Sequence, residues 1–461
     1  MTQLEAAQGM LAWLVQEGGY VHPNVEARQD ATGLGLYATS PIARDERLIS
    51  CPSSLAVTPA LARAAIADVC GVTPADLVHA GAPWPERMLA AVYVGLHALH
   101  ADEWPQALKH RAYTATLRAP PTPHLWTDAE RALLAGTNLA GAVETQAREW
   151  RAEAETVREV LKEEGFTWEL YAALNAHVSS RAFPSALLRL PSGSETSAAS
   201  TPVEESHPVL LPGLDLLNHK RGQAITWLSA KIAGAAADVP AISFVSPGQP
   251  PGQVYNNYGA RGNESLLLGY GFVLAPSPDT PEGNPDDTLV LQLGGMNPEI
   301  VAALEKQGIQ AGQRFEVRRD GVLPQDLVRT VRVMMADSAC ACCGGDGHEH
   351  GDEDAHEHEH GHNHDDHDDE DEHAAHEKEV AELELELDVL GMLGSMLEDK
   401  LSRLEDEPEA AAAARPEIAR MARIYRQGQV AIAEAALTQL AERVERVETL
   451  LADGPTCPCG C

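Results

Sequence analysis

Five short motifs decide the fold of this chain, and they lie far apart in the sequence. They read Gly33-Leu34-Gly35-Leu36, Ser180-Arg181-Ala182-Phe183, Asp215-Leu216-Leu217-Asn218-His219, Asn256-Asn257-Tyr258-Gly259 and Gly269-Tyr270-Gly271-Phe272. A single Gly-x-Gly or Asn-His pair says little, because such residues often serve a turn or a satisfied polar position in a core. The order and spacing of the whole set are far more specific than any one motif.

The segments around these motifs predict a β-rich domain interrupted by helices. Pro and Gly breaks indicate short strands within residues 32–58, with runs at 47–51 and 55–58, and again at 224–228, 241–245 and 254–258. Helical periodicity covers 4–15 and then four runs within 59–183, at 86–101, 129–134, 144–164 and 170–180. Residues 190–208 are rich in Ser, Thr and Pro and predict a flexible loop.

The second half of the chain predicts a mainly helical domain. After a Pro-rich, acidic linker up to residue 287, the pattern favours a strand at 288–293 and a helix at 298–307. Leucines recur every three or four residues in 379–404, and 416–452 is also helical, so we expect these leucines to form a core. Residues 344–377 hold ten histidines and fifteen acidic residues without Lys or Arg, which predicts disorder.

Composition narrows the functional classes. The 461 residues carry a formal net charge of −35, which repels phosphate backbones, so we expect neither nucleic acid nor a membrane as partner. An acidic surface favours encounter with a basic protein. No long apolar run and no basic leader followed by a cleavage site are recognisable, so we expect a soluble protein of the cytoplasm, the nucleus or both. Six of the eight cysteines fall into two tight groups, unlike a disulfide framework.

In this order, the five motifs resemble the SET-domain methyltransferases, in particular the branch typified by the RuBisCO large-subunit lysine methyltransferase. The helices between the two β-rich parts also match that branch. A later segment, Ile424-Tyr425-Arg426-Gln427-Gly428-Gln429, is similar to its helical substrate-binding domain. The resemblance implies an α+β fold: a β-rich pseudoknotted SET domain with a helical insertion, followed by a mainly helical domain. It further implies that S-adenosylmethionine binds on one face and that a lysine enters through a channel from the other.

The resemblance also implies domain boundaries. The SET domain would span 1–276, split into 20–85 and 205–276 by a helical insertion at about 86–204. Residues 277–343 would form a linker and the start of the substrate-binding domain, which continues as helices over 378–453. The insert 344–377 and the Cys-rich tail 454–461 fall outside the resemblance.

Roles for individual residues follow from the same resemblance. The implied cofactor-binding residues are Gly33, Leu34, Gly35, Leu36, Arg181, Asp215, Asn218, His219 and Tyr258. Glycines without Cβ allow close backbone approach, and Arg suits the carboxylate end of the cofactor. Tyr258 is the implied catalytic residue beside the transferring methyl, and Phe183, Tyr270 and Phe272 are expected to line the substrate channel. The alternative for Arg181 is a structural salt bridge, and for the aromatic residues it is sheet packing.

Metal binding is a separate possibility in the His- and Cys-rich segments. Imidazole and thiolate groups are suitable ligands for zinc, nickel or copper, although solvated low-complexity sequence is the simpler interpretation. The candidate ligands are His356, His358, His360, His362, His364, Cys340, Cys342, Cys343, Cys457, Cys459 and Cys461. No catalytic role is expected for such a metal.

The sequence thus predicts an S-adenosylmethionine-dependent protein-lysine N-methyltransferase with a non-histone substrate, possibly a ribosomal protein. Three other functions stay open: a metal-binding or metal-buffering protein on a degenerate SET scaffold, a SET pseudoenzyme that binds proteins without turnover, and a protein-histidine methyltransferase.

Overall fold

The computed structural model describes residues 1–30, 33–102, 104–189, 193–196, 206–232, 239–342, 367–406 and 413–453. The chain divides into two compact units. The first comprises Met1–Arg131, Leu139–Leu274 and Ala413–Met421, and the second Ala132–Asn138, Ala275–Ala412 and Ala422–Cys461. The predicted domain boundaries stay predictions.

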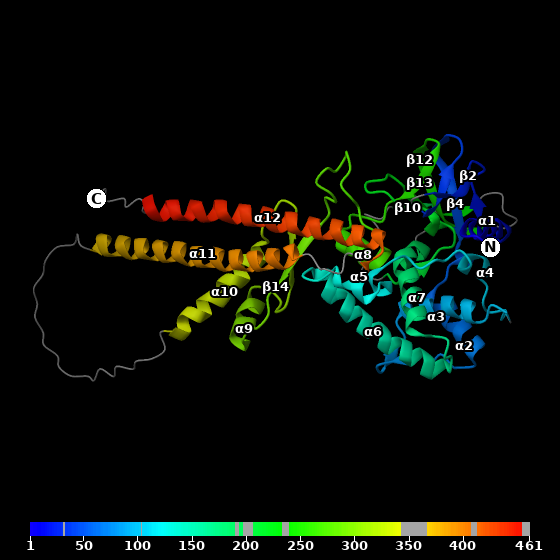
Figure 1. The fold of residues 1–461 in the computed structure, drawn as a ribbon, viewed down its shortest axis with the longest axis horizontal. Helices are drawn as coiled ribbons and strands as arrows, with labels where there is room; N and C mark the ends of the chain where they lie inside the picture. The colour runs from blue at the N-terminus through cyan, green and yellow to red at the C-terminus, as the bar shows by residue number, and fades with distance from the viewer. Residues whose placement is uncertain are drawn as a thin grey trace, which may run out of the picture. The chain divides into compact units, whose positions relative to one another are not determined.

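The first unit combines short strands with helices (Figure 1). Its strands are β1 (Tyr20–Val21), β2 (Val25–Asp30), β3 (Gly33–Ala38), β4 (Ile42–Pro52), β5 (Val78–His79), β6 (Ala82–Pro83), β7 (Ala182–Pro184), β8 (Ser194–Thr196), β9 (Pro208–Leu210), β10 (Asn218–His219), β11 (Thr226–Ile232), β12 (Val239–Gln249) and β13 (Gly252–Asn256). Its helices are α1 (Gln3–Gln16), α2 (Pro59–Cys70), α3 (Glu86–Leu99), α4 (Arg111–Thr114), α5 (Asp128–Ala132), α6 (Asn138–Leu161), α7 (Trp168–Arg181) and α8 (Asn263–Tyr270).

Two sheets position the motifs. One has the strand order β1-β4-β12-β11-β8 and the other β10-β13-β3-β2. In the second sheet β10 pairs with β13 in parallel, so that His219 lies opposite Asn256, and β13 pairs with β3 in antiparallel fashion. Three of the five motifs thereby meet in one sheet, although about 180 residues separate the first motif from the third.

The predicted helices of the insertion are confirmed as α3, α5, α6 and α7. The strand expected at 55–58 is wrong. Ser53–Leu55 form a 3₁₀ turn, and only Val57 makes a bridge, to Leu210. The Thr58 side chain accepts a hydrogen bond from the Leu61 N–H and caps α2, so the chain turns into a helix before a strand can form.

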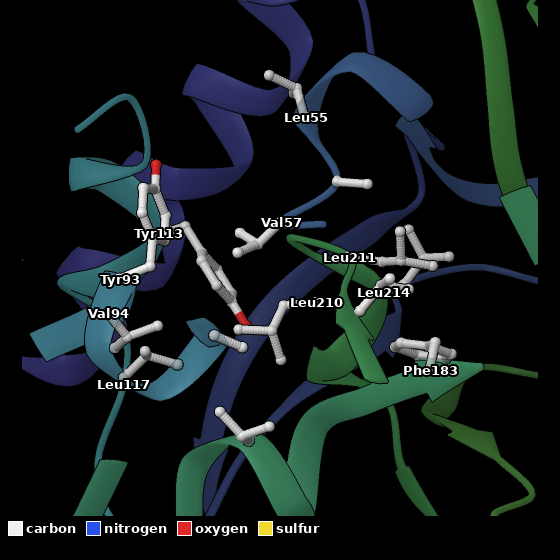
Figure 2. Packing of buried hydrophobic residues seen from close by; sticks show 14 of the residues in the cluster. Leu55, Val57, Tyr93, Val94, Tyr113, Leu117, Phe183, Leu210, Leu211 and Leu214 are labelled. Atoms are coloured by element: carbon white, nitrogen blue, oxygen red, sulfur yellow. The ribbon is translucent and has the colours of Figure 1, made fainter. Parts of the chain in front are cut away.

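Figure 2 shows the buried core beside this turn, where Val57 lies close to Leu210, and Leu211 and Leu214 lie next to each other. Leu211 and Leu214 are fully buried. The segment that precedes the Asn218-His219 pair is therefore anchored by apolar packing, which fixes the position of the following polar motif.

One part of the expected loop at 190–208 is a strand. Ser194–Thr196 form β8, which pairs with β11, while much of the remaining loop lies outside the described residues. The pairing was missed because a Ser-Glu-Thr run has weak β-propensity and depends on its partner strand.

In its described part, the second unit contains an antiparallel pair of strands, β14 (Thr288–Gln292) and β15 (Arg314–Arg318), together with four helices. The helices are α9 (Pro298–Lys306), α10 (Gln325–Cys342), α11 (His367–Glu405) and α12 (Pro416–Asp453), of which α12 begins in the first unit. Within the second unit α11 and α12 run alongside each other (Figure 1). Val389, Leu390, Leu393 and Leu397 are fully buried, so the leucines of α11 form a core as predicted.

The prediction of disorder for 344–377 is wrong from His367 onward, because α11 begins there. Residues 344–366 lie outside the described part of the chain.

The Ile424–Gln429 motif (residues 424–429) stabilises the second unit. The buried Arg426 guanidinium on α12 donates to the carbonyl oxygens of Leu404, Leu133 and Ala135, at 2.7, 2.8 and 2.6 Å. Gln429 donates to the Thr288 carbonyl oxygen at 2.7 Å. Backbone carbonyls at the end of α11 and in 132–138 thus gain a charged donor.

None of the described helices is both long and apolar enough to cross a membrane.

Candidate active site

A cavity of about 390 Å³ opens in the first unit, where four of the five motifs contribute to its wall. Its lining comes from the end of α7 and β7, from the residues before and at the start of β9, and from the segments around η4 (Leu214–Leu216), β11 and β13–α8. The lining residues are Ser180, Arg181, Ala182, Phe183, Pro184, Ser206, His207, Pro208, Asp215, Leu217, Trp227, Asn256, Tyr258, Arg261 and Tyr270.

Three rings form a continuous stack at this cavity. The His219 and Tyr258 rings are 5.0 Å apart at 26°, and the Tyr258 and Tyr270 rings are 5.0 Å apart at 24°. Phe272 contacts both ends of the stack, at 6.2 Å from His219 and 6.2 Å from Tyr270. The Asn-His, Asn-Asn-Tyr-Gly and Gly-Tyr-Gly-Phe motifs therefore meet in space.

Tyr258 is fixed at both of its polar ends. Its Oη donates to the Leu217 carbonyl oxygen at 3.0 Å, and its N–H donates to Nδ1 of His219 at 3.0 Å. Burial raises the pKa of Tyr258, so the phenol stays a neutral donor at ordinary pH. Because His219 accepts through Nδ1, its proton lies on Nε2 in the neutral ring.

A buried ion pair lies in the same wall. Nη1 of Arg181 is 3.1 Å from Oδ2 of Asp215, and the Tyr113 Oη donates to that oxygen at 2.9 Å. The Asp215 side chain is 1% exposed and that of Arg181 18%. Desolvation opposes the charge of Arg181, but Asp215 and Tyr113 outweigh it, and the pKa of Arg181 is raised. Arg181 therefore forms the salt bridge that the sequence offered as its alternative role. Both partners of this salt bridge line the cavity.

Two polar atoms of this ion pair have no hydrogen-bond partner among the described residues. They are Nε of Arg181 and Oδ1 of Asp215, a donor and an acceptor that are both buried. A ligand with an anionic and a cationic group, such as the amino-acid end of S-adenosylmethionine, carries the acceptor and the donor that these two atoms lack, since buried polar groups are normally paired. The residues present therefore fit such a group.

The Gly33–Leu36 motif (residues 33–36) lies beside the cavity motifs but does not line the cavity. Asn218 Nδ2 donates to the Leu34 carbonyl oxygen at 3.1 Å and joins β10 to β3. A Cβ on Gly35 would lie 2.7 Å from Nε2 of Gln253 and 3.0 Å from Nδ2 of Asn218, so any larger residue there would displace these amide groups.

The other two residues of this motif differ in character. Gly33 has φ +104°, a backbone conformation that favours glycine, and space surrounds its Cβ position. Leu36 is 1% exposed and belongs to the core, so it offers a ligand almost no surface.

The predicted channel residues take different positions. Phe183 and Tyr270 line the cavity, whereas Phe272 contacts the ring stack from outside the lining. Phe183 packs edge-on against Trp227 at 5.7 Å, so it serves both the wall and the aromatic core. Sheet packing and lining are therefore compatible roles.

Sequence reasoning missed the roles of Trp227 and Asn256 in the cavity wall and of Tyr113, which bonds to the wall residue Asp215. Trp227 donates through Nε1 to Oδ1 of Asn256 at 3.2 Å, and that oxygen also accepts the Asn257 N–H at 2.8 Å. Tyr113, from the helical insertion, supports Asp215 across 102 positions of sequence. Nothing in the Arg-Ala-Tyr-Thr run around Tyr113 signals this contact, whereas Asn256 was part of a recognised motif.

The candidate metal ligands lie outside what the structure describes. Cys340 and Cys342 fall within the backbone of α10, but their side chains are not described, and the remaining candidates are Cys343, His356, His358, His360, His362, His364, Cys457, Cys459 and Cys461. Among the described side chains, no group of three or more His, Cys, Asp or Glu is arranged to hold a metal ion.

No family model matches the chain. Over 305 residues it is 29% identical to the ribosomal lysine N-methyltransferase set10 of Schizosaccharomyces pombe, covering 64% of this chain and 49% of that protein. The chain thus spans about half the length of the curated relative it matches.

Solved structures match over nearly the whole chain. The SET domain of LSMT bound to lysine and AdoHcy aligns with a TM-score of 0.66 at 18% identity, covering 96% of this chain and 93% of that one. Rubisco LSMT bound to AdoMet aligns with a TM-score of 0.64 at 18% identity and the same coverage. At this identity the likeness establishes the fold, and the resemblance predicted from the five motifs is confirmed at that level: the chain has the SET fold of Rubisco LSMT.

Proposed function

We propose that this protein is an S-adenosylmethionine-dependent protein-lysine N-methyltransferase with a non-histone substrate. The observation that carries the proposal is the cavity wall formed by the Tyr258 stack and the Arg181–Asp215 pair. The matched relative set10 is a ribosomal lysine N-methyltransferase, and this supports a ribosomal protein as the target here.

The cofactor, when bound, supplies a methyl group on a sulfonium, and displacement by an amine is an in-line reaction. In such a reaction the protein contributes chiefly alignment and a preorganised polar environment. Asn218, His219 and the Gly33–Leu36 backbone hold the cofactor in this proposal, and the unpaired atoms of Arg181 and Asp215 bind its amino-acid end. Tyr258 stands beside the reacting atoms, oriented by Leu217 and His219.

The target lysine must be neutral before it attacks. A lysine in water has a pKa of about 10.4, and transfer into a cavity lined by aromatic rings lowers it because the charged form loses its hydration. Phe183 and Tyr270 provide such a lining, and ring faces also tolerate a partly methylated ammonium.

The net charge of −35 favours encounter with a basic protein substrate. We place the protein in the cytoplasm, the nucleus or both, and we expect neither nucleic acid nor a membrane among its partners.

The direct test is calorimetric binding of S-adenosylmethionine, followed by transfer of tritiated methyl groups to proteins of a ribosomal fraction. We expect micromolar binding that is lost when Asn218 and His219 are both replaced by Ala. The matched control is the double replacement of Asn24 and His22, a second Asn/His pair in which the Asn24 N–H donates to His22 Nδ1 away from the cavity.

Three outcomes of this test would overturn the proposal. Absence of cofactor binding together with at least one equivalent of bound metal supports the metal-binding alternative. Loss of binding in the control pair as well would show that the cofactor-site assignment is wrong. Methyl groups recovered on histidine instead of lysine support the protein-histidine methyltransferase.

A further inference from the structure

Two buried triads of the same chemistry lie in the first unit, each made of a tyrosine, a carboxylate and an arginine. The first is Tyr113, Asp215 and Arg181, and the second is Tyr171, Glu153 and Arg87. In both, the tyrosine is fully buried, and burial raises the pKa of its phenol, so it stays a neutral donor to the carboxylate. Asp215 and Arg181 line the cavity, whereas no member of the second triad is among the lining residues.

The two triads differ in how the carboxylate oxygens are used. In the second, Arg87 Nη2 lies 2.5 Å from Oε1 of Glu153, and Tyr171 Oη donates to Oε2 at 2.8 Å, so both oxygens are satisfied. In the cavity triad both donors converge on Oδ2 of Asp215, and Oδ1 has no partner among the described residues. A buried acceptor without a donor is costly, so it is expected where a ligand supplies that donor.

The Tyr113 hydroxyl keeps the ion pair of the cavity triad one-sided. An arginine and a carboxylate often pair through two parallel N–H···O bonds. Here Arg181 Nη1 donates to Oδ2 of Asp215 at 3.1 Å and to the Asp215 carbonyl oxygen at 3.3 Å, while Tyr113 holds Oδ2 at 2.9 Å. Without the hydroxyl, rotation of the carboxylate would let Arg181 contact both of its oxygens, and the unpaired acceptor would be lost.

The helical insertion fixes the position of Tyr113. This residue lies on α4, in the core shown in Figure 2. Directly before α4, the ring of His110 donates through Nε2 to the Leu55 carbonyl oxygen at 3.0 Å and accepts the Tyr93 hydroxyl at Nδ1, at 2.6 Å. The start of α4 is therefore tied to α3 and to the turn at Leu55, and the hydroxyl of Tyr113 reaches Asp215 from a well-anchored helix.

We propose that Tyr113 is a positioning residue: by holding Oδ2 of Asp215 it keeps Oδ1 available for the amino group of the cofactor's amino-acid end, whose carboxylate pairs with Nε of Arg181. The unpaired acceptor and the unpaired donor belong to one ion pair, which matches a ligand end that carries both an amino and a carboxylate group. The identity of the ligand rests on the proposed function. The one-sided geometry rests on the contacts of the triad alone.

The test compares Tyr113→Phe with Tyr171→Phe, since each removes one hydroxyl from a buried triad of the same composition. The probes are S-adenosylhomocysteine and 5′-methylthioadenosine, two thioethers of the same nucleoside, of which only the first carries the amino-acid end. Calorimetry on the full chain gives both Kd values, and hydrogen exchange gives the stability of the first unit.

We expect Tyr113→Phe to raise the Kd of S-adenosylhomocysteine on the order of tenfold, the size of one charge-assisted hydrogen bond, and to leave the Kd of methylthioadenosine unchanged. Tyr171→Phe should change neither Kd, although both variants should lower the stability of the first unit. Equal weakening of the two ligands in Tyr113→Phe, a loss of stability without any change in Kd, or the same selective loss in Tyr171→Phe would overturn the inference.

Crystal structures of the wild type and of Tyr113→Phe test the geometry without any ligand. In the variant we expect Arg181 to contact both carboxylate oxygens of Asp215, and an unchanged contact through Oδ2 alone overturns the inference. A wild type that binds neither thioether contradicts the proposed function instead, and the contact between Arg181 and Asp215 in the variant still decides the role of Tyr113.

Discussion

Breaking the buried ion pair between Arg181 and Asp215 should destabilise the first unit strongly and non-additively. The pair is separated by 3.1 Å, and the Asp215 carboxylate is almost fully withdrawn from water. Arg181→Met leaves that carboxylate with Tyr113 as its remaining side-chain donor among the described residues. Asp215→Asn keeps the shape and removes the charge.

The expected magnitude follows from the distance and the burial. At 3.1 Å and an effective dielectric constant of 20, the attraction between the charges is about 5 kcal/mol before desolvation is subtracted. Removal of one partner of a buried pair costs about 3 to 5 kcal/mol, so we expect Arg181→Met to fall in that range. The double variant should cost less than the sum of the single variants, with a coupling energy of about 2 to 3 kcal/mol.

The assay must report on the first unit alone, because a chain with two units need not unfold in one transition. Amide hydrogen exchange measured on peptides of the first unit gives its free energy of unfolding. The control cycle uses the exposed pair Arg131–Asp128, which should couple by less than about 1 kcal/mol. Additive effects at Arg181 and Asp215, or equal coupling in both cycles, would refute the reasoning.

Two further predictions concern packing and pH. Gly321 and Gly312 have nearly equal φ, +73° and +75°, but a Cβ at Gly321 would overlap the backbone of Ala435, whereas one at Gly312 would have its nearest neighbour at 3.8 Å. Gly321→Ala should cost about 3 kcal/mol or more and Gly312→Ala about 1, measured by hydrogen exchange in the second unit, and equal losses would contradict this. Hydrogen bonds from Arg415 lower the pKa of Glu130 to about 2. The stability that Glu130 contributes is therefore present above about pH 4.3, the unfolded value, and lost toward pH 2. Denaturant unfolding of the first unit should show a deficit for Glu130→Gln at pH 7 that shrinks near pH 2.5, and a deficit independent of pH would contradict the assignment.

The sequence predicted local structure well where periodicity was strong. The helices of the insertion and the leucine core of α11 follow directly from apolar spacing. The residues at 55–58 look like a strand, but capping by Thr58 decided the conformation there. A cap competes with a strand over a few residues, and hydrophobic pattern alone does not register that competition.

The site could be predicted only through the order of its motifs. No local pattern indicates that Asn218 and His219 pair in parallel with β13, because such pairing depends on how the chain crosses over. The contact of Tyr113 with Asp215 and the stacking of Tyr258 on Tyr270 depend in the same way on tertiary packing. Which side chains point into the cavity depends on how the two sheets assemble, and no local sequence pattern predicts this.

The most direct test of the central claim compares Tyr258→Phe with Tyr255→Phe in tritiated methyl transfer from S-adenosylmethionine to lysine. Both variants remove one phenol oxygen, but Tyr255 does not line the cavity, and the Tyr258 Oη alone is bonded to Leu217 at the reacting wall. We predict that Tyr258→Phe binds the cofactor normally and transfers methyl groups at least about a hundredfold more slowly, whereas Tyr255→Phe is unaffected. Equal transfer by Tyr258→Phe and the wild type would contradict the account.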